Sequence, residues 1–157
     1  MPKLRFSDRY FPLVALTIVA FFLLSSVAGA DERQRTGIFT VAVVDDAVYV
    51  GHATPLGDSG NFELHGLVET DGECSGYYRY HAFPSGRARF KCTNGLAGSV
   101  RIKADGTLAG SGRGSLDGKR IRLVFGYSLH RTNRLLKFPG DRELRLDDKK
   151  IVLVDSG

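Results

Sequence analysis

The sequence of 157 residues has few of the side chains with which proteins bind metals and cofactors. It has only two cysteines, which do not form a CxxC pair, and four histidines that stand singly along the chain. Structural zinc sites need several such ligands at short, regular spacings. The phosphate-binding Walker pattern fails at Arg113 and Arg120, and no GxGxxG sequence occurs. We therefore expect neither a metal site nor a cofactor.

Catalytic arrangements of side chains are also missing from the sequence. Gly57-Asp58-Ser59-Gly60 is similar to the surroundings of a serine-protease nucleophile, but only His52 precedes Ser59 in this short chain. Four acidic residues could supply the carboxylate pair of a glycoside hydrolase, namely Glu63, Glu69, Asp71 and Glu73. We expect the first two to face outward and the last to lie in a turn, as a solvated acidic edge. We predict that the protein is not an enzyme.

The first thirty residues have the pattern of a targeting segment. Lys3, Arg5 and Arg9 precede an apolar run over residues 11–27, and Ala28-Gly29-Ala30 fits a cleavage site. We predict a signal peptide over residues 1–30, a single domain over 31–157, and an exported protein that is periplasmic or secreted. The alternative is an uncleaved signal that anchors the chain in a membrane, because about 18 apolar residues are close to the minimum for a span.

Positive charge is concentrated in the middle of the predicted mature chain. Without residues 1–30, Lys and Arg number 19, and Asp and Glu number 16. Residues 77–126 alone hold ten Lys or Arg against only Asp105 and Asp117, a net charge of +8. The basic segment therefore survives removal of the signal peptide, and the rest of the mature chain is acidic.

Apolar and polar residues alternate between Tyr77 and Phe125, which predicts β-strands. Turn sequences such as Asn94-Gly95 and Asp117-Gly118 recur at short intervals and favour antiparallel hairpins. We predict strands over residues 38–44, 47–50, 61–69, 75–83, 86–92, 97–104, 107–115, 119–128, 144–146 and 151–154. Residues 128–142 form a long connection with room for a short helix. The fold is thus expected to be all-β, a small antiparallel meander that forms a barrel or curled sandwich of about eight to ten strands.

Both cysteines lie on the inward face of the predicted sheet. Phe62, Leu64 and Val68 are expected to point inward from one strand, and Cys74 and Cys92 share this face from neighbouring strands. Such a pair is joined in an oxidising compartment. We predict a Cys74–Cys92 disulfide that contributes about 3 kcal/mol in the chain-entropy model.

The outward face of the same strands carries most of the basic side chains of the domain. These are Arg79, Arg87, Arg89, Lys91, Arg101, Lys103, Arg113, Arg120 and Arg122. Like charges opposite one another on neighbouring strands destabilise a sheet, so this arrangement has a cost unless anions neutralise it. The anions could be internal, from the acidic edge or from Asp147 and Asp148, or they could belong to a ligand. The alternative is a solvated exterior that keeps the protein soluble.

Glycine takes every inward position from Gly110 to Gly114. In strands, glycine marks a sharp bend or the close approach of another backbone, and small barrels bend at such positions. We favour this structural role over a groove that opens for a ligand.

Cysteines, glycines and turns follow one another in a distinct order in the middle of the chain. They are Cys74-x-Gly76, Gly86 to Phe90, Cys92-Thr93-Asn94-Gly95, the glycines 110 to 114, Asp117-Gly118 and Val124-Phe125-Gly126. This order resembles that of a group of small exported proteobacterial proteins, which have C-x-G, C-x-D-G, G-x-G-x-G and F-x-F-G in succession. Asn94 stands where Asp is usual. The resemblance implies a shared small β-fold over residues 61–126, and it implies no functional residues.

These features together favour a non-catalytic binding module whose basic face engages an anionic component of the cell envelope. The ligand would be an acidic or phosphorylated polysaccharide, a lipid headgroup or an acidic protein, since arginine suits bidentate contacts with carboxylate and phosphate. Tyr77, on the same register, could stack on a sugar ring. Export argues against nucleic acid, and membrane contact would come only through an uncleaved signal. The alternative is a structural or inhibitory protein that docks on a protein partner through a sheet edge or the Gly110–Gly114 strand.

Overall fold

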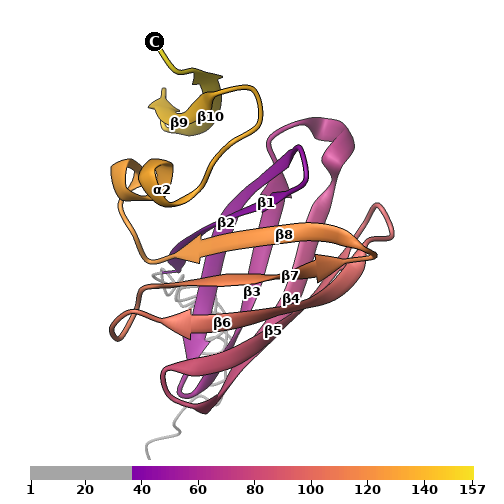
Figure 1. The fold of residues 1–157 in the computed structure, drawn as a ribbon, viewed down its shortest axis with the longest axis vertical. Helices are drawn as coiled ribbons and strands as arrows, with labels where there is room; N and C mark the ends of the chain where they lie inside the picture. Colours follow the sequence, from indigo (N-terminus) through magenta and orange to yellow (C-terminus); the bar gives the residue numbers. More distant parts are fainter. Residues whose placement is uncertain (1–36) are drawn as a thin grey trace, which may run out of the picture. The chain divides into compact units, whose positions relative to one another are not determined.

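The computed structural model describes residues 37–157, whose main feature is an eight-stranded barrel (Figure 1). The predicted signal peptide, residues 1–30, lies outside the described residues. The barrel strands are β1 (Ile38–Val44), β2 (Ala47–Leu56), β3 (Ser59–Gly66), β4 (Glu73–Ala82), β5 (Ser85–Cys92), β6 (Ala97–Ala104), β7 (Gly110–Leu116) and β8 (Lys119–Phe125). Each strand pairs antiparallel with the next, and β8 returns to pair with β1. The predicted all-β meander is confirmed, and it closes as a barrel.

Tight turns join the strands where the sequence indicates them. At the β7–β8 turn, Asp117 and Gly118 both have positive φ, 45° and 79°, as a two-residue type I′ hairpin turn requires. The Asp117 carboxylate accepts a hydrogen bond from the Ala97 backbone N–H at 2.7 Å. This turn therefore also holds the start of β6.

Several predicted strand boundaries differ from the structure. The strand predicted over 61–69 ends at Gly66, and Val68, which we expected to point inward, is 57% exposed. It precedes a short 3₁₀ helix, η1 (Glu69–Asp71), which with Gly72 at a φ of 73° interrupts the extended chain. Glu73, expected in a turn, is the first residue of β4. The strand prediction extended too far because residues 67–68 are apolar and continue the alternation. The strand ends before them, and the residues that follow form η1 and the turn at Gly72.

The barrel interior is densely packed at the end where β1 stops and β2 begins. Tyr49, Leu64, Leu116 and Ile121 are fully buried there. The Tyr49 hydroxyl donates to the backbone oxygen of Asp71 at 3.1 Å, and the Asn94 side-chain amide donates to the same oxygen at 2.9 Å. These bonds tie η1 and the β5–β6 turn across this end, which we call the closed end.

The predicted disulfide is confirmed at the closed end. Cys74 on β4 lies directly opposite Cys92 on β5, and the two sulfurs are bonded. Both side chains are buried in the inner core. Structural disulfides of this kind are typical of proteins in oxidising, non-cytoplasmic compartments.

The glycines of β7 let neighbouring strands approach closely. Gly112 and Gly114 lie opposite Ile102 and Val100 of β6. A Cβ at Gly112 would be 2.6 Å from Cγ1 of Val100, and one at Gly114 would collide with the backbone oxygen of Ser99. The space inside β7 is thus filled by its neighbours, which agrees with the structural role expected for these glycines.

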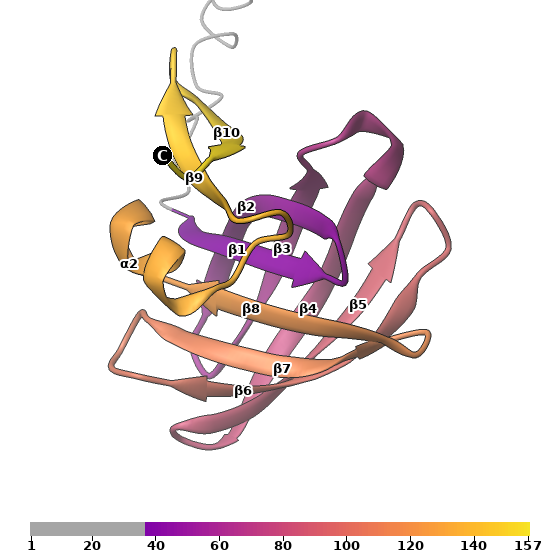
Figure 2. The same ribbon diagram turned by 45° about the horizontal axis from the view of Figure 1, so that its top comes forward.

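Residues 128–157, which we call the C-terminal segment, pack on the outside of the barrel (Figures 1 and 2). The segment contains α2 (Leu129–Leu135), within the predicted connection, and a two-stranded antiparallel sheet of β9 (Arg142–Asp147) and β10 (Lys150–Asp155). A second apolar cluster joins Leu136, Phe138 and Leu144 to outward side chains of the barrel, Val41, Val43, Val48 and Val124. β1 is therefore buried on both faces, which explains its uninterrupted apolar sequence.

Side-chain hydrogen bonds fix the two parts of the C-terminal segment to each other. Asn133 of α2 accepts from the Leu144 backbone N–H at 3.0 Å and donates to the Leu144 carbonyl at 2.9 Å. The Ser128 hydroxyl caps α2 by accepting from the Arg131 N–H at 3.4 Å. Over residues 37–157, no helix is long and apolar enough to cross a membrane.

Candidate functional site

All nine predicted basic residues and Tyr77 lie on the outer face of the barrel, on β4 to β8. Eight of the nine cations are exposed, and Arg122 is half-buried. The period-two alternation that placed them outward is the same one that places Ala88, Val100 and Ile121 inside. The structure therefore keeps the predicted set on one surface.

Five arginines form a continuous row across β4 to β8, five strands that lie side by side in the barrel (Figure 2). The register places Arg79 opposite Arg87, Arg87 opposite Arg101, Arg101 opposite Arg113, and Arg113 opposite Arg122. We call these five residues the arginine row. Adjacent strands are about 4.8 Å apart, so the row extends over roughly 19 Å of curved surface.

The other predicted cations flank this row. Arg89 lies opposite Tyr77 and Ser99, and its guanidinium is 6.0 Å from the centre of the Tyr77 ring. Arg120 lies at the same level of the barrel as Arg89, but Ser115 of β7 and Ser99 of β6 stand between the two arginines. The two lysines lie at opposite ends of the strands and face no other cation. Lys91 lies opposite Ser75 and Ala97, and Lys103 lies opposite Ser85 and Ser111. Arg79 therefore belongs to the row of opposed arginines, and Arg89 does not.

No carboxylate of residues 37–157 forms an ion pair with the arginine row. The pairs found in this part of the chain join His65 to Glu73 at 3.2 Å, Arg131 to Asp105 at 3.3 Å and Arg145 to Glu143 at 2.8 Å. The sequence left open whether the acidic edge, or Asp147 and Asp148, neutralises these arginines. In the described residues, neither group forms an ion pair with the row. The only hydrogen bond from a guanidinium of the row in the described chain runs from Arg122 Nη2 to the Lys137 carbonyl, at 3.2 Å.

One end of the row borders a surface groove with a volume of about 570 Å³. Arg79, Arg87 and Arg89 line it together with Tyr77, and so do Asn61 and His81, which we had not selected from the sequence. His81 could have been found, because it follows Arg79 by two residues on β4. Asn61 depends on the pairing of β3 with β4, which places it opposite Tyr77. No acidic side chain lines this groove.

The arginine row should lower the stability of the fold, because directly opposed like charges repel. We expect Arg101→Gln, which removes the central charge, to stabilise the protein by about 0.5 kcal/mol at low salt. The difference should shrink as added salt screens the charges. Thermal denaturation of both proteins over a range of NaCl concentrations measures this effect.

Arg134→Gln is the matched control for this change, since Arg134 is an exposed arginine on α2, away from the barrel strands. It should leave the salt dependence of unfolding unchanged. A lower stability of Arg101→Gln at low salt would show that its neighbours do not repel it.

No family model, curated protein or solved structure matches the chain. The resemblance to small exported proteobacterial proteins therefore stays a prediction. Within residues 37–157, no three His, Cys, Asp or Glu side chains gather into a group that could hold a metal ion. Function must be inferred from the surface of the barrel itself.

Proposed function

We propose that this protein is an exported, non-catalytic binding module that engages an anionic component of the cell envelope through the arginine row. The observation that carries the proposal is the register, which lines up five arginines without an internal counter-ion in the described chain. An arrangement that weakens the fold is explained if a ligand supplies the missing negative charge.

The chemistry of the row favours an extended ligand that carries carboxylate or phosphate groups. Guanidinium groups contact either anion in a bidentate manner. The row offers four exposed guanidinium groups in succession, followed by the half-buried one of Arg122, which also donates to the Lys137 carbonyl. The groove beside the row adds the exposed ring of Tyr77 and the amide of Asn61. An acidic or phosphorylated polysaccharide fits this combination, because its charges repeat along a chain and a sugar ring can stack on tyrosine.

Export is supported by two independent features. The first is the signal-like sequence of residues 1–30, and the second is the buried Cys74–Cys92 disulfide. A periplasmic or secreted location would bring the basic face into contact with anionic glycans and lipid headgroups of the envelope.

The closed barrel limits the alternative of docking through a sheet edge. β7, which contains Gly110 to Gly114, is hydrogen-bonded to β6 on one side and β8 on the other. In the described part of the chain, the remaining sheet edges belong to β9 and β10. Partner docking there would depend on backbone bonds and would tolerate salt.

The proposal is tested by sedimentation of the oxidised protein with isolated cell-envelope fractions at low and high salt. We expect the protein to pellet at low salt and to be released at high salt. The double variant Arg87→Glu/Arg101→Glu should stay in the supernatant under both conditions, because it reverses two neighbouring charges of the row.

Arg134→Glu/Lys150→Glu is a matched control, because it changes the net charge equally at exposed positions of α2 and β10. It should pellet like the wild type. Equal loss in both double variants would mean that net charge, and not the row, drives binding. Pelleting that persists at high salt would instead support docking on a protein partner.

A further inference from the structure

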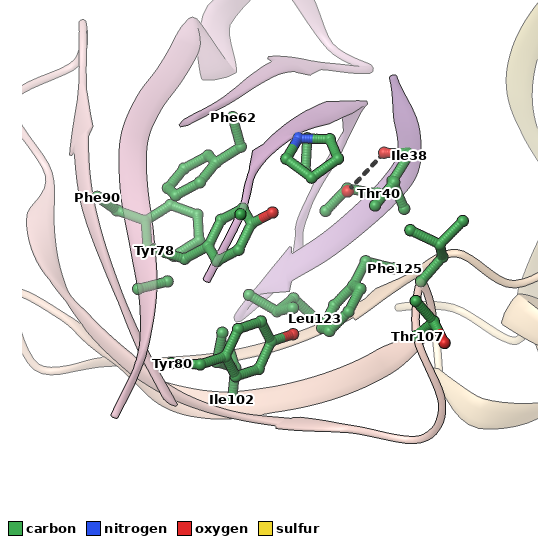
Figure 3. Close-up of a pocket in the computed structure, with 15 residues that line it drawn as sticks. Ile38, Thr40, Phe62, Tyr78, Tyr80, Phe90, Ile102, Thr107, Leu123 and Phe125 are labelled. Atoms are coloured by element: carbon green, nitrogen blue, oxygen red, sulfur yellow. Dashed lines mark hydrogen bonds between the residues drawn. The ribbon is translucent and has the colours of Figure 1, made fainter. Parts of the chain in front are cut away.

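The barrel contains a cavity at the end opposite the closed end (Figure 3). Its volume is about 160 Å³. Side chains reach it from strands on all sides, including Thr40 of β1, Phe62 of β3, Tyr78 of β4, Ile102 of β6 and Phe125 of β8. We call this the open end, because Pro55, Gly57, Thr107 and Leu108 line the cavity and are exposed to solvent.

The wall of the cavity is almost entirely apolar. Five aromatic rings line it, those of Phe62, Tyr78, Tyr80, Phe90 and Phe125, and Figure 3 shows them around a common space. The Thr40 hydroxyl is already used, since it donates to the Ile38 carbonyl at 3.0 Å. Burial raises the pKa of the Tyr78 and Tyr80 hydroxyls, so both are neutral at physiological pH. Such a wall offers little to water or to a charged ligand.

The size of the cavity limits what it can hold. An engineered apolar cavity of about 150 Å³ stays dry and binds benzene, whereas pockets for drug-sized ligands start at about 300 Å³. The present cavity belongs to the first class. It has room for a single aromatic ring or for a short stretch of an alkyl chain.

Exposed apolar side chains lie at the three hairpin connections of the open end. Leu56, Phe83 and Leu108 are 62%, 66% and 56% exposed there. Leu108 lines the cavity itself, whereas Leu56 lines the outer groove beside the arginine row. The Phe83 ring is 5.8 Å from that of Tyr80, which is 5.8 Å from that of Tyr78 inside the cavity. A continuous aromatic path therefore leads from the rim to the interior.

The β6–β7 loop at the open end is bonded to the chain that follows β8. Asp105, in the β6–β7 loop that carries Leu108, accepts from the Tyr127 hydroxyl at 2.9 Å and from Arg131 at 3.3 Å. The Arg131 guanidinium also lies 4.5 Å above the Tyr127 ring. The closed end, by contrast, is filled by Tyr49 and sealed by hydrogen bonds. The two ends of the barrel thus differ, and only the open end leads to a cavity.

We propose that the open end of the barrel binds a compact apolar group, about the size of a benzene ring, that enters past Phe83 and Leu108. Two kinds of molecule present such a group, namely an aromatic compound and the end of an alkyl chain. The site lies inside the barrel, whereas the arginine row lies outside it, so it does not depend on the proposed function.

The test uses benzene and 1-octanol as probes and follows the methyl signals of the protein by NMR. We expect saturable shifts of the Ile102 and Leu123 methyl groups, which line the cavity. Leu144 and Ile151 belong to the apolar cluster outside the barrel, and their signals should not move. Shifts with benzene alone would identify a ring-bearing ligand, and shifts with both probes would extend the site to alkyl chains.

Two variants locate the site. Ala88→Leu adds three carbons to a buried wall residue and should abolish the saturable shifts while leaving the protein folded. Leu108→Asn, at the rim, should weaken binding of 1-octanol. Val68→Asn is its matched control, because Val68 is 57% exposed and follows β3 at the closed end.

Three results would overturn the inference. These are the absence of saturable shifts with both probes, unchanged shifts in Ala88→Leu, and equal weakening by Leu108→Asn and Val68→Asn. Arg87→Glu/Arg101→Glu should bind benzene like the wild type, so failure of envelope binding and failure of cavity binding are separate outcomes.

Discussion

Gly114→Ala is expected to destabilise the protein by about 2–3 kcal/mol, although it adds a single carbon. A Cβ at Gly114 would collide with the Ser99 backbone oxygen and lie 2.7 Å from Val100 Cα. Backbone atoms of a paired strand cannot rotate away, so β6 and β7 must separate. Replacing glycine by alanine where there is space instead stabilises a fold by about 0.4–1 kcal/mol. The sign of the change in the free energy of unfolding, measured with denaturant, therefore shows whether there is space for a side chain at Gly114.

Ser115→Ala is the control for this prediction. Ser115 is the next residue of β7, and its side chain is exposed on the outer face. This change should alter the free energy of unfolding by no more than about 0.5 kcal/mol. Stability of Gly114→Ala equal to or above that of the wild type would mean that the interior has room at β7.

The elements of the barrel could be predicted because local signals were strong and agreed with one another. The strands β1 and β6 have the predicted bounds, 38–44 and 97–104. Alternation determines which face each side chain occupies, and Asp-Gly and Asn-Gly turns set where the chain reverses. The pairing of Cys74 with Cys92 followed from the same face assignment on neighbouring strands.

The arginine row could be predicted only as a face. Alternation shows that Arg79 of β4 and Arg89 of β5 both point outward. It does not show which residue of the neighbouring strand lies opposite each of them. That depends on register, which a bulge between Tyr80 and Ala82 shifts near the β4–β5 turn. If β4 were shifted by two residues against β5, Arg79 would no longer lie opposite Arg87, and the row of arginines would be interrupted.

The cavity and the C-terminal cover depend on contacts between residues far apart in sequence. Tyr78 and Tyr80 could be placed inside, but whether their rings fill the barrel depends on side chains from β1, β3, β6 and β8. Likewise, the continuous apolar run of β1 indicates that its outward valines are covered, but it does not show which residues cover them. The covering residues lie about a hundred positions later, at Leu136, Phe138 and Leu144.

The outer surface of the barrel has two parts, one covered by the C-terminal segment and one exposed to solvent. β1, β2 and β8 carry outward valines, which the C-terminal segment removes from water. β4 to β7 carry outward cations, which nothing in the described chain covers. Arg122 lies at the boundary, half-buried and bonded to Lys137 of the segment. The segment therefore both completes the fold and marks one end of the proposed binding surface.

Because of this role, Leu144→Ala should be among the most damaging substitutions in the chain. Leu144 is 1% exposed, and Asn133 holds its backbone through two hydrogen bonds. Loss of its side chain leaves a cavity between β9 and the barrel, with an expected cost of about 2–5 kcal/mol. Leu146→Ala provides the control on the same strand, since Leu146 is 65% exposed and should cost less than about 0.5 kcal/mol. Denaturant unfolding measures both, and similar losses in the two variants would show that β9 does not anchor the segment to the barrel.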